Sequence, residues 1–154
     1  MEYAPFGPQV NVPTADIIAG GWTECHSRRY DSAMSKADYE SIRDSQCNSA
    51  CIMIGCRQIG TGSMSVVAWA PYLDVFQPTE LTNKCKDNGG IGRVSQGTKW
   101  YMYDSDNEFN RGVFGFADDQ SRLDLYCVDT GTEQPEKRLS WWWDYPASTL
   151  GGYR

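Results

Sequence analysis

The chain has 154 residues and a formal net charge of −6, and it contains no cluster of lysine and arginine. This length suits one domain with its own hydrophobic core, whereas the negative charge argues against a surface that binds nucleic-acid phosphates. No apolar run approaches the roughly 18 residues of a transmembrane helix, so we expect no membrane span. Nine Tyr, six Trp, five Phe, 15 Gly and seven Pro favour a β-rich domain with many turns.

The chain is predicted to begin with an extended N-terminal arm at residues 1–15, followed by a single β-rich domain at residues 16–154. Three prolines favour extended backbone in the arm. Its apolar side chains, Tyr3, Phe6 and Val10, have little of their own to pack on. We therefore expect the arm or the last strand to pack against a neighbouring subunit.

Two elements are predicted between the arm and the first long apolar run. Residues 17–25 are predicted as the first core strand. Residues 36–45 are predicted as the one helix, because Ser35 can cap its N-terminus and Asp38 lies at its third position.

A buried β-hairpin is predicted at residues 47–71. Two apolar runs, at 51–56 and 66–70, flank the turn-forming sequence Gly60-Thr61-Gly62-Ser63. Three cysteines lie in the first half of this segment, so we expect it to be cross-linked to the rest of the domain.

The remaining strands are predicted from alternating or aromatic runs at residues 73–76, 100–103, 113–117, 123–127 and 139–143. Residues 77–98 are polar and rich in turn-forming residues, so we predict a long loop there. The predicted fold is a mostly antiparallel, sandwich-like single β domain with one short helix, stabilised by disulfides.

Six cysteines in a domain of this size favour disulfides and an extracellular compartment. A zinc site is the alternative, because Cys47, Cys51 and Cys56 are spaced almost like zinc ligands and Cys85 could be a fourth. The apolar, strand-like surroundings of Cys51 and Cys56 favour disulfides over zinc. The predicted bridges are Cys25–Cys47 and Cys51–Cys85, with Cys56 either joined to Cys127 or left free.

Different short motifs are distributed along nearly the whole chain: Phe6-Gly7-Pro8-Gln9, Gly20-Gly21-Trp22-Thr23-x-Cys25, Gly55-Cys56-Arg57, Ala68-x-Ala70-Pro71 with Asp74-Val75, Trp100-Tyr101, Gly115-Phe116-Ala117, Cys127-x-Asp129-Thr130, Arg138-Leu139-Ser140-Trp141 and Gly151-Gly152-Tyr153-Arg154. In order and spacing they resemble an uncharacterised family of domains that occurs mostly in large secreted or cell-surface proteins. The resemblance implies the compartment and the domain limits, and it carries no known activity, cofactor or catalytic residue.

The chain departs from the family pattern in two places. Family members often continue past the final Gly-Gly-aromatic-Arg motif with a cysteine. They also often have a cysteine where Ser140 stands and a histidine where Trp142 stands. These departures leave the pairing of Cys56 and Cys127 open.

Two polar segments are candidates for a functional site. His26 is the only histidine, so a Ser-His-Asp or Cys-His mechanism would have to use it, but we predict a surface histidine. Asp104, Asp106 and Glu108 alternate along a polar segment and could bind calcium through their oxygens. A plain hairpin tip is the favoured alternative, because the glycine and distal glutamate of an EF-hand loop are missing.

The run Trp141-Trp142-Trp143, followed by Tyr145, is the candidate contact surface. On a strand, Trp141 and Trp143 share one face and Trp142 takes the other. We predict that Trp142, with Tyr145 and Trp143, contacts a sugar ring or a partner protein. The equally weighted alternative is that both faces of the strand are covered within the fold.

The expected function is that of an extracellular structural or adhesion module, not an enzyme, that acts through protein–protein contacts. Its expected partners are other protein subunits, in a homo-oligomer or a larger assembly; no cofactor is expected, with calcium as the alternative. The alternative is a carbohydrate-binding, lectin-like module, with or without calcium. The sequence does not indicate the ligand.

Overall fold

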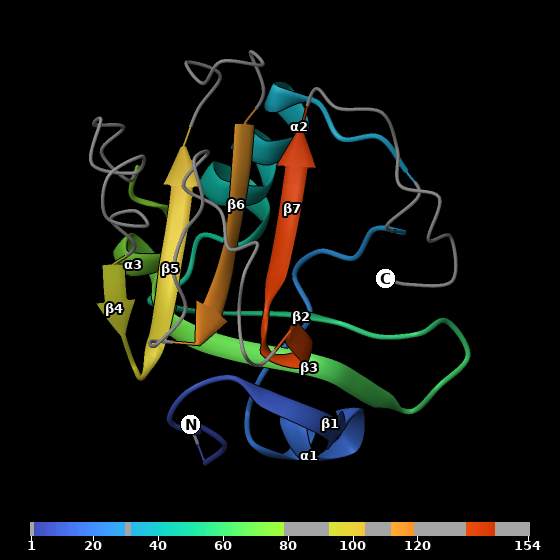
Figure 1. The fold of residues 1–154 in the computed structure, drawn as a ribbon. Coiled ribbons are helices and arrows are strands. Elements are labelled where there is room, and N and C mark those ends of the chain that lie inside the picture. Colours follow the sequence, from blue (N-terminus) through green and yellow to red (C-terminus); the bar gives the residue numbers. More distant parts are fainter. Residues whose placement is uncertain (1, 30–31, 79–92, 104–111, 119–134, 144–154) are drawn as a thin grey trace.

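The computed structural model describes residues 2–29, 32–78, 93–103, 112–118 and 135–143 (Figure 1). Its elements in chain order are β1 (Gln9–Pro13), α1 (Thr14–Ala19), α2 (Lys36–Ser41), the π-helical turn η1 (Ile42–Gln46), β2 (Cys51–Cys56), β3 (Ser63–Pro71), α3 (Tyr72–Phe76), β4 (Arg93–Ser95), β5 (Thr98–Tyr103), β6 (Gly112–Asp118), the short 3₁₀ helix η2 (Pro135–Lys137) and β7 (Leu139–Trp143). The strands form two antiparallel sheets, ordered β1-β3-β2 and β4-β5-β6-β7. These two sheets and the disulfide between Cys25 and Cys47 confirm the predicted disulfide-stabilised β domain.

The predicted hairpin is confirmed as the pair β2 and β3. Ile52 lies opposite Ala70, and Cys56 lies opposite Val66. Ile52, Val66, Ala68 and Ala70 are buried, because the two strands pack against the core of the domain. The Gly-rich segment between them is the connection that the sequence indicates.

The N-terminal arm packs on its own domain, whereas we expected the arm or the last strand to pack against a neighbouring subunit. β1 pairs with β3, so the arm adds an edge strand to the three-stranded sheet. The indole Nε1 of Trp22 donates a hydrogen bond to the Tyr3 carbonyl (2.6 Å), and that of Trp69 donates to the Pro5 carbonyl (2.8 Å). The two indole rings lie 6.2 Å apart and hold the arm in place.

Two segments that we predicted as strands are short helices. Residues 14–19 form α1, which has no buried residue and no side-chain cap, and residues 20–29 after it contain neither helix nor strand. Residues 72–76 form α3, in which Val75 and Phe76 face the core. Because each of these helices is only five or six residues long, its apolar residues match a short strand equally well.

The predicted helix is confirmed, although it is completed by a π-helical turn. The Ser35 hydroxyl accepts from the Asp38 N–H (3.1 Å), and the Asp38 carboxylate accepts from the Ser35 N–H (3.0 Å). This reciprocal capping box satisfies two backbone donors at the start of α2. After α2, the Cys47 N–H donates to the carbonyl of Ile42, five residues earlier, which widens the last turn.

The four-stranded sheet contains three predicted strands and one that we did not predict. β5, β6 and β7 fall on the predicted aromatic runs. β4 falls inside the predicted loop, where Gln96 and Gly97 both have positive φ and form a two-residue hairpin turn to β5. Gly115 of β6 lies so close to the Leu139 carbonyl of β7 that a Cβ would collide with it. The predicted strand at 123–127 lies outside the described residues.

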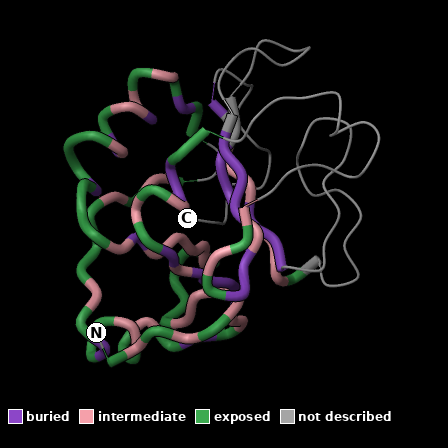
Figure 2. Tube along the Cα trace, turned by 90° about the vertical axis from the view of Figure 1, so that its left-hand side faces the viewer, coloured by how far each residue is buried: buried purple, intermediate pink, exposed green. Residues whose placement is uncertain are grey.

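The core lies between the four-stranded sheet, the α2–η1 segment and the three-stranded sheet, whose strands cross one end of the larger sheet (Figure 1). Its centre is aromatic: Tyr39 of α2 stacks on Trp143 of β7, with ring centroids 4.3 Å apart and planes inclined by 11°. Phe114 lies against Tyr39 from β6. Buried positions are concentrated along the larger sheet, while the arm and the coil after α1 are mostly exposed or half-buried (Figure 2).

Candidate functional site

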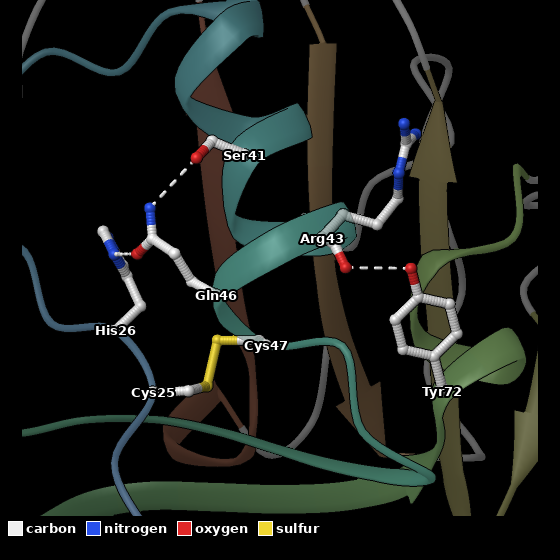
Figure 3. Close-up of a disulfide and its surroundings, with 7 residues drawn as sticks. All are labelled: Cys25, His26, Ser41, Arg43, Gln46, Cys47 and Tyr72. Atoms are coloured by element: carbon white, nitrogen blue, oxygen red, sulfur yellow. Dashed lines mark hydrogen bonds between the residues drawn. A yellow bond between two sulfur atoms is a disulfide. The ribbon is translucent and has the colours of Figure 1, made fainter.

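The predicted Cys25–Cys47 disulfide is present, with a Cα–Cα distance of 5.3 Å. It joins the irregular segment at residues 20–29 to the end of η1 (Figure 3). Cys25 is exposed and Cys47 is buried, so one sulfur-bearing residue faces solvent and the other contacts the core.

Cys51 and Cys56 are half-buried and form no disulfide among the described residues, so the predicted Cys51–Cys85 bridge and the open pairing of Cys56 stay predictions. Their expected partners, Cys85 and Cys127, lie outside the described residues. Both free cysteines lie on β2, and the even number of cysteines alone could not fix which of them pair. Burial raises the pKa of the Cys56 thiol, because the apolar surroundings disfavour the thiolate.

Neither candidate metal site is supported by the described part of the chain. Cys47, a residue of the alternative zinc cluster, is bonded to Cys25 and cannot act as a thiolate ligand. Within the described ranges, no three His, Cys, Asp or Glu residues are grouped to hold a metal ion. The candidate calcium ligands Asp104, Asp106 and Glu108 lie outside the described residues.

The tryptophan run is mostly part of the core. Trp143 is fully buried, so our prediction that it contacts a ligand or partner is wrong; its ring is stacked on Tyr39. Trp141 lies half-buried against Phe114, with parallel rings 6.2 Å apart, on the same sheet face as Trp143 as predicted. The side chain of Trp142 and the whole of Tyr145 lie outside what the structure describes.

His26 is half-buried, whereas we predicted a surface histidine. Its Nδ1 lies 2.8 Å from Gln46 Oε1, and the Gln46 amide in turn donates to the Ser41 hydroxyl (Figure 3). The other ring nitrogen, Nε2, is buried and has no hydrogen-bond partner among the described residues.

A cavity of about 90 Å³ lies beside this histidine and the disulfide. His26, Cys25 and Cys47 form one wall, and four consecutive residues of β2 form another. The remaining lining side chains are apolar and come from η1, α3, β6 and β7, including Trp141. No sequence pattern indicates this cavity, because its walls come from segments far apart in the chain.

A second feature is three exposed apolar side chains on β4 or on segments that contact β4 or its turn, which we call the β4 corner: Phe6, Leu73 and Val94. The side chains of Arg93 and Ser95 reach α3, so Val94 between them points to the opposite face of β4. They are 77%, 67% and 58% exposed, respectively. The Phe6 ring covers Gly97 in the β4–β5 turn so closely that a Cβ there would collide with it. Leu73 precedes Asp74, which accepts hydrogen bonds from the side chains of β4.

Two contacts place α3 against β4. Arg93 Nη1 donates to the Asp74 carbonyl (2.6 Å), and the Ser95 hydroxyl donates to the Asp74 carboxylate (2.7 Å). Figure 1 shows α3 beside β4. We did not predict the corner, because Val94 lies in a segment that we predicted as a loop. The turn Ser95-Gln96-Gly97-Thr98 was the sequence feature that could have indicated the β4–β5 hairpin.

Comparison of the chain with protein-family models, with curated protein sequences and with solved structures finds no significant match. The structure itself defines a small β domain with two antiparallel sheets and a disulfide. No helix within the described ranges has the length and apolar character needed to cross a bilayer.

Proposed function

We propose that this protein is an extracellular structural or adhesion module that acts through protein–protein contact with other subunits in an assembly. The observation that carries the proposal is the β4 corner, where Phe6, Leu73 and Val94 are each more than half exposed. Burying a side chain of this size contributes about 1.5–3 kcal/mol. A contiguous exposed apolar patch is typical of an interaction site, and we propose that these side chains contribute to one.

The backbone of β4 supports the same role. Ser95 and Thr98 flank a two-residue turn and therefore form a hydrogen-bonded pair, so the next pair, Val94 and Lys99, is a non-hydrogen-bonded one. The N–H and C=O of Val94 consequently point away from β5. Among the described strands β4 is an edge of its sheet, and we propose that these groups pair with a strand of another subunit.

The disulfide supports the extracellular part of the proposal, because disulfides persist in oxidising compartments. The family resemblance in the sequence points to the same compartment and remains a prediction. Neither line of support involves a catalytic group, and we propose a binding role and no enzymatic activity.

The test is a lysine substitution at the corner, matched to one elsewhere. Val94→Lys places a charge on the β4 edge, and Ile59→Lys changes a 42% exposed isoleucine in the β2–β3 connection. We expect Val94→Lys to weaken self-association by at least about tenfold, since one apolar contact and its edge pairing are lost. Ile59→Lys should leave association unchanged.

Sedimentation equilibrium of both variants and the wild type measures the association constant, and urea unfolding checks that the variants are folded. Equal association of all three proteins would contradict the proposed surface. The carbohydrate-binding alternative depends on Trp142, Tyr145 and the acidic segment at 104–108, and the described residues provide no observation that favours it.

A further inference from the structure

We infer that the strand that pairs with β4 is the β4 of a second copy of this chain, antiparallel to the first and related to it by a two-fold axis at Val94. The inference rests on the proposed function, because it names the partner of the surface proposed there. It is carried by the hydrogen-bonding pattern of β4 and by two opposite charges on one side of this strand.

The backbone of β4 determines which residues meet. Arg93 and Ser95 form hydrogen-bonded pairs with Trp100 and Thr98 of β5, whereas the N–H and C=O of Val94 point away from β5. Val94 is therefore the one residue of β4 that pairs through the open edge. Two antiparallel copies then place Val94 opposite Val94 of the second copy, and Arg93 opposite Ser95 of the second copy. Such a contact is self-complementary and closes at two chains.

The charges beside β4 are complementary in this register. The Arg93 guanidinium donates to the carbonyls of Asp74 (2.6 Å) and Gln77 (3.0 Å), and the Asp74 carboxylate accepts from the Ser95 hydroxyl (2.7 Å). Within the described part of the chain, neither charged group is in an ion pair.

Pairing of two copies brings these two charges together. Residues directly opposite on antiparallel strands point to the same face, so Arg93 of one copy lies beside Ser95 of the other and beside the Asp74 carboxylate that this serine binds. The two-fold axis repeats the contact, so each chain supplies one guanidinium and one carboxylate. This complementarity favours a second copy over an unrelated strand as the partner.

The exposed apolar side chains fit the same arrangement. Val94 points to the face of β4 opposite to Arg93 and Ser95, where it lies next to Val94 of the second copy, and branched side chains opposite one another stabilise an antiparallel pair. Leu73 precedes Asp74 on α3, at the other face, and is 67% exposed. Both faces of the contact thus carry an exposed apolar side chain.

The first experiment uses the wild-type protein. Isotope-labelled and unlabelled chains are mixed in equal amounts, and isotope-filtered NOE spectra record contacts between chains alone. A non-hydrogen-bonded antiparallel pair brings its two Cα atoms to about 4.5 Å, so we expect an inter-chain signal between the Hα atoms of Arg93 and Ser95. Light scattering on the same sample measures the association itself.

The second experiment exchanges the two charges. Arg93→Glu and Asp74→Arg should each weaken self-association by about tenfold, because like charges then meet twice across the axis. In an equimolar mixture of the two variants, association should return to near the wild-type constant, since opposite charges meet again between the chains. Each chain in the mixture keeps its own like-charge pair, so this recovery reports contact between chains. The matched control, Arg93→Glu/Asp74→Arg in one chain, should associate like the wild type.

The outcomes separate this inference from the proposed function. A wild type that associates without the Arg93–Ser95 signal would overturn the inference and leave the proposed function standing, whereas a monomeric wild type would overturn both. Folded single variants that associate like the wild type, or whose mixture stays weak, would also overturn the inference. The inter-chain signal decides the question even where a variant does not fold.

Discussion

Removal of the Cys25–Cys47 disulfide is expected to lower the free energy of unfolding by about 3 kcal/mol. The two cysteines are 22 residues apart in sequence, and a bridge over a loop of that length removes about 3 kcal/mol of chain entropy from the unfolded state. For a chain of this size, about 3 kcal/mol corresponds to a decrease of about 6–12 °C in the midpoint of thermal unfolding. Alanine is suitable at both positions, because Cys47 is buried and a polar replacement would add an unpaired hydroxyl.

The assay is urea-induced unfolding of the wild type and of the Cys25→Ala/Cys47→Ala variant, each with and without a phosphine reductant. The reductant should destabilise the wild type to the level of the variant and leave the variant unchanged. A loss below about 1 kcal/mol would refute the loop-entropy reasoning. A further loss on reducing the variant would reveal a second disulfide, such as the Cys51–Cys85 bridge that the sequence predicts.

Three further predictions concern the core and the helix cap. Trp143→Ala should cost about 3–5 kcal/mol in urea unfolding, because it leaves a large cavity beside Tyr39; a loss near zero would contradict its place in the core. Ser35→Ala should cost about 1 kcal/mol by removing the cap of α2, whereas an unchanged unfolding curve would show that the cap is not formed. The hydrogen bond from the Ser35 N–H lowers the pKa of the Asp38 carboxyl below 3.8, so this carboxylate stabilises the fold at neutral pH and the effect disappears as pH falls through the lowered pKa. Asp38→Asn should therefore be destabilising at neutral pH and not in strong acid, and an equal effect at both would contradict the assignment.

Local sequence patterns were sufficient to predict a structural element where the segment contained enough residues of the type that the element requires. The β2–β3 hairpin followed from two apolar runs around a Gly-rich turn, and the start of α2 followed from Ser35 and Asp38. The Cys25–Cys47 bridge followed from cysteines that bracket the helix. For the hairpin and the helix start the decisive residues are close in sequence, so one local pattern accounts for the structure.

The predicted secondary structure was wrong for two short apolar segments. Ile17 and Ile18 lie in α1, and Leu73 lies in α3, although we assigned both segments to strands. Helices this short have little intrinsic stability, so contacts with the rest of the domain decide their conformation. The hydrogen bond from the Tyr72 hydroxyl to the Arg43 carbonyl (2.9 Å), which joins α3 to η1, is one such contact.

The surface sites depend on packing between segments that are distant in sequence. Trp143 looked like a contact residue within the run of three tryptophans, yet its ring meets Tyr39 from a helix about a hundred residues earlier. Val94 lay in an apparently featureless loop, and it became a candidate only when β4 was seen at the edge of the sheet. The sequence shows which residues are apolar, whereas tertiary packing decides which of them remain exposed.

The central claim is that the protein associates with other subunits, and the molar mass of the wild-type protein in solution tests it most directly. Multi-angle light scattering across a range of micromolar concentrations should give a mass that rises above the 17.3 kDa of one chain as concentration increases. A further check is that Val94→Lys stays at the mass of one chain under the same conditions. A wild-type mass of 17.3 kDa at every concentration would contradict the claim.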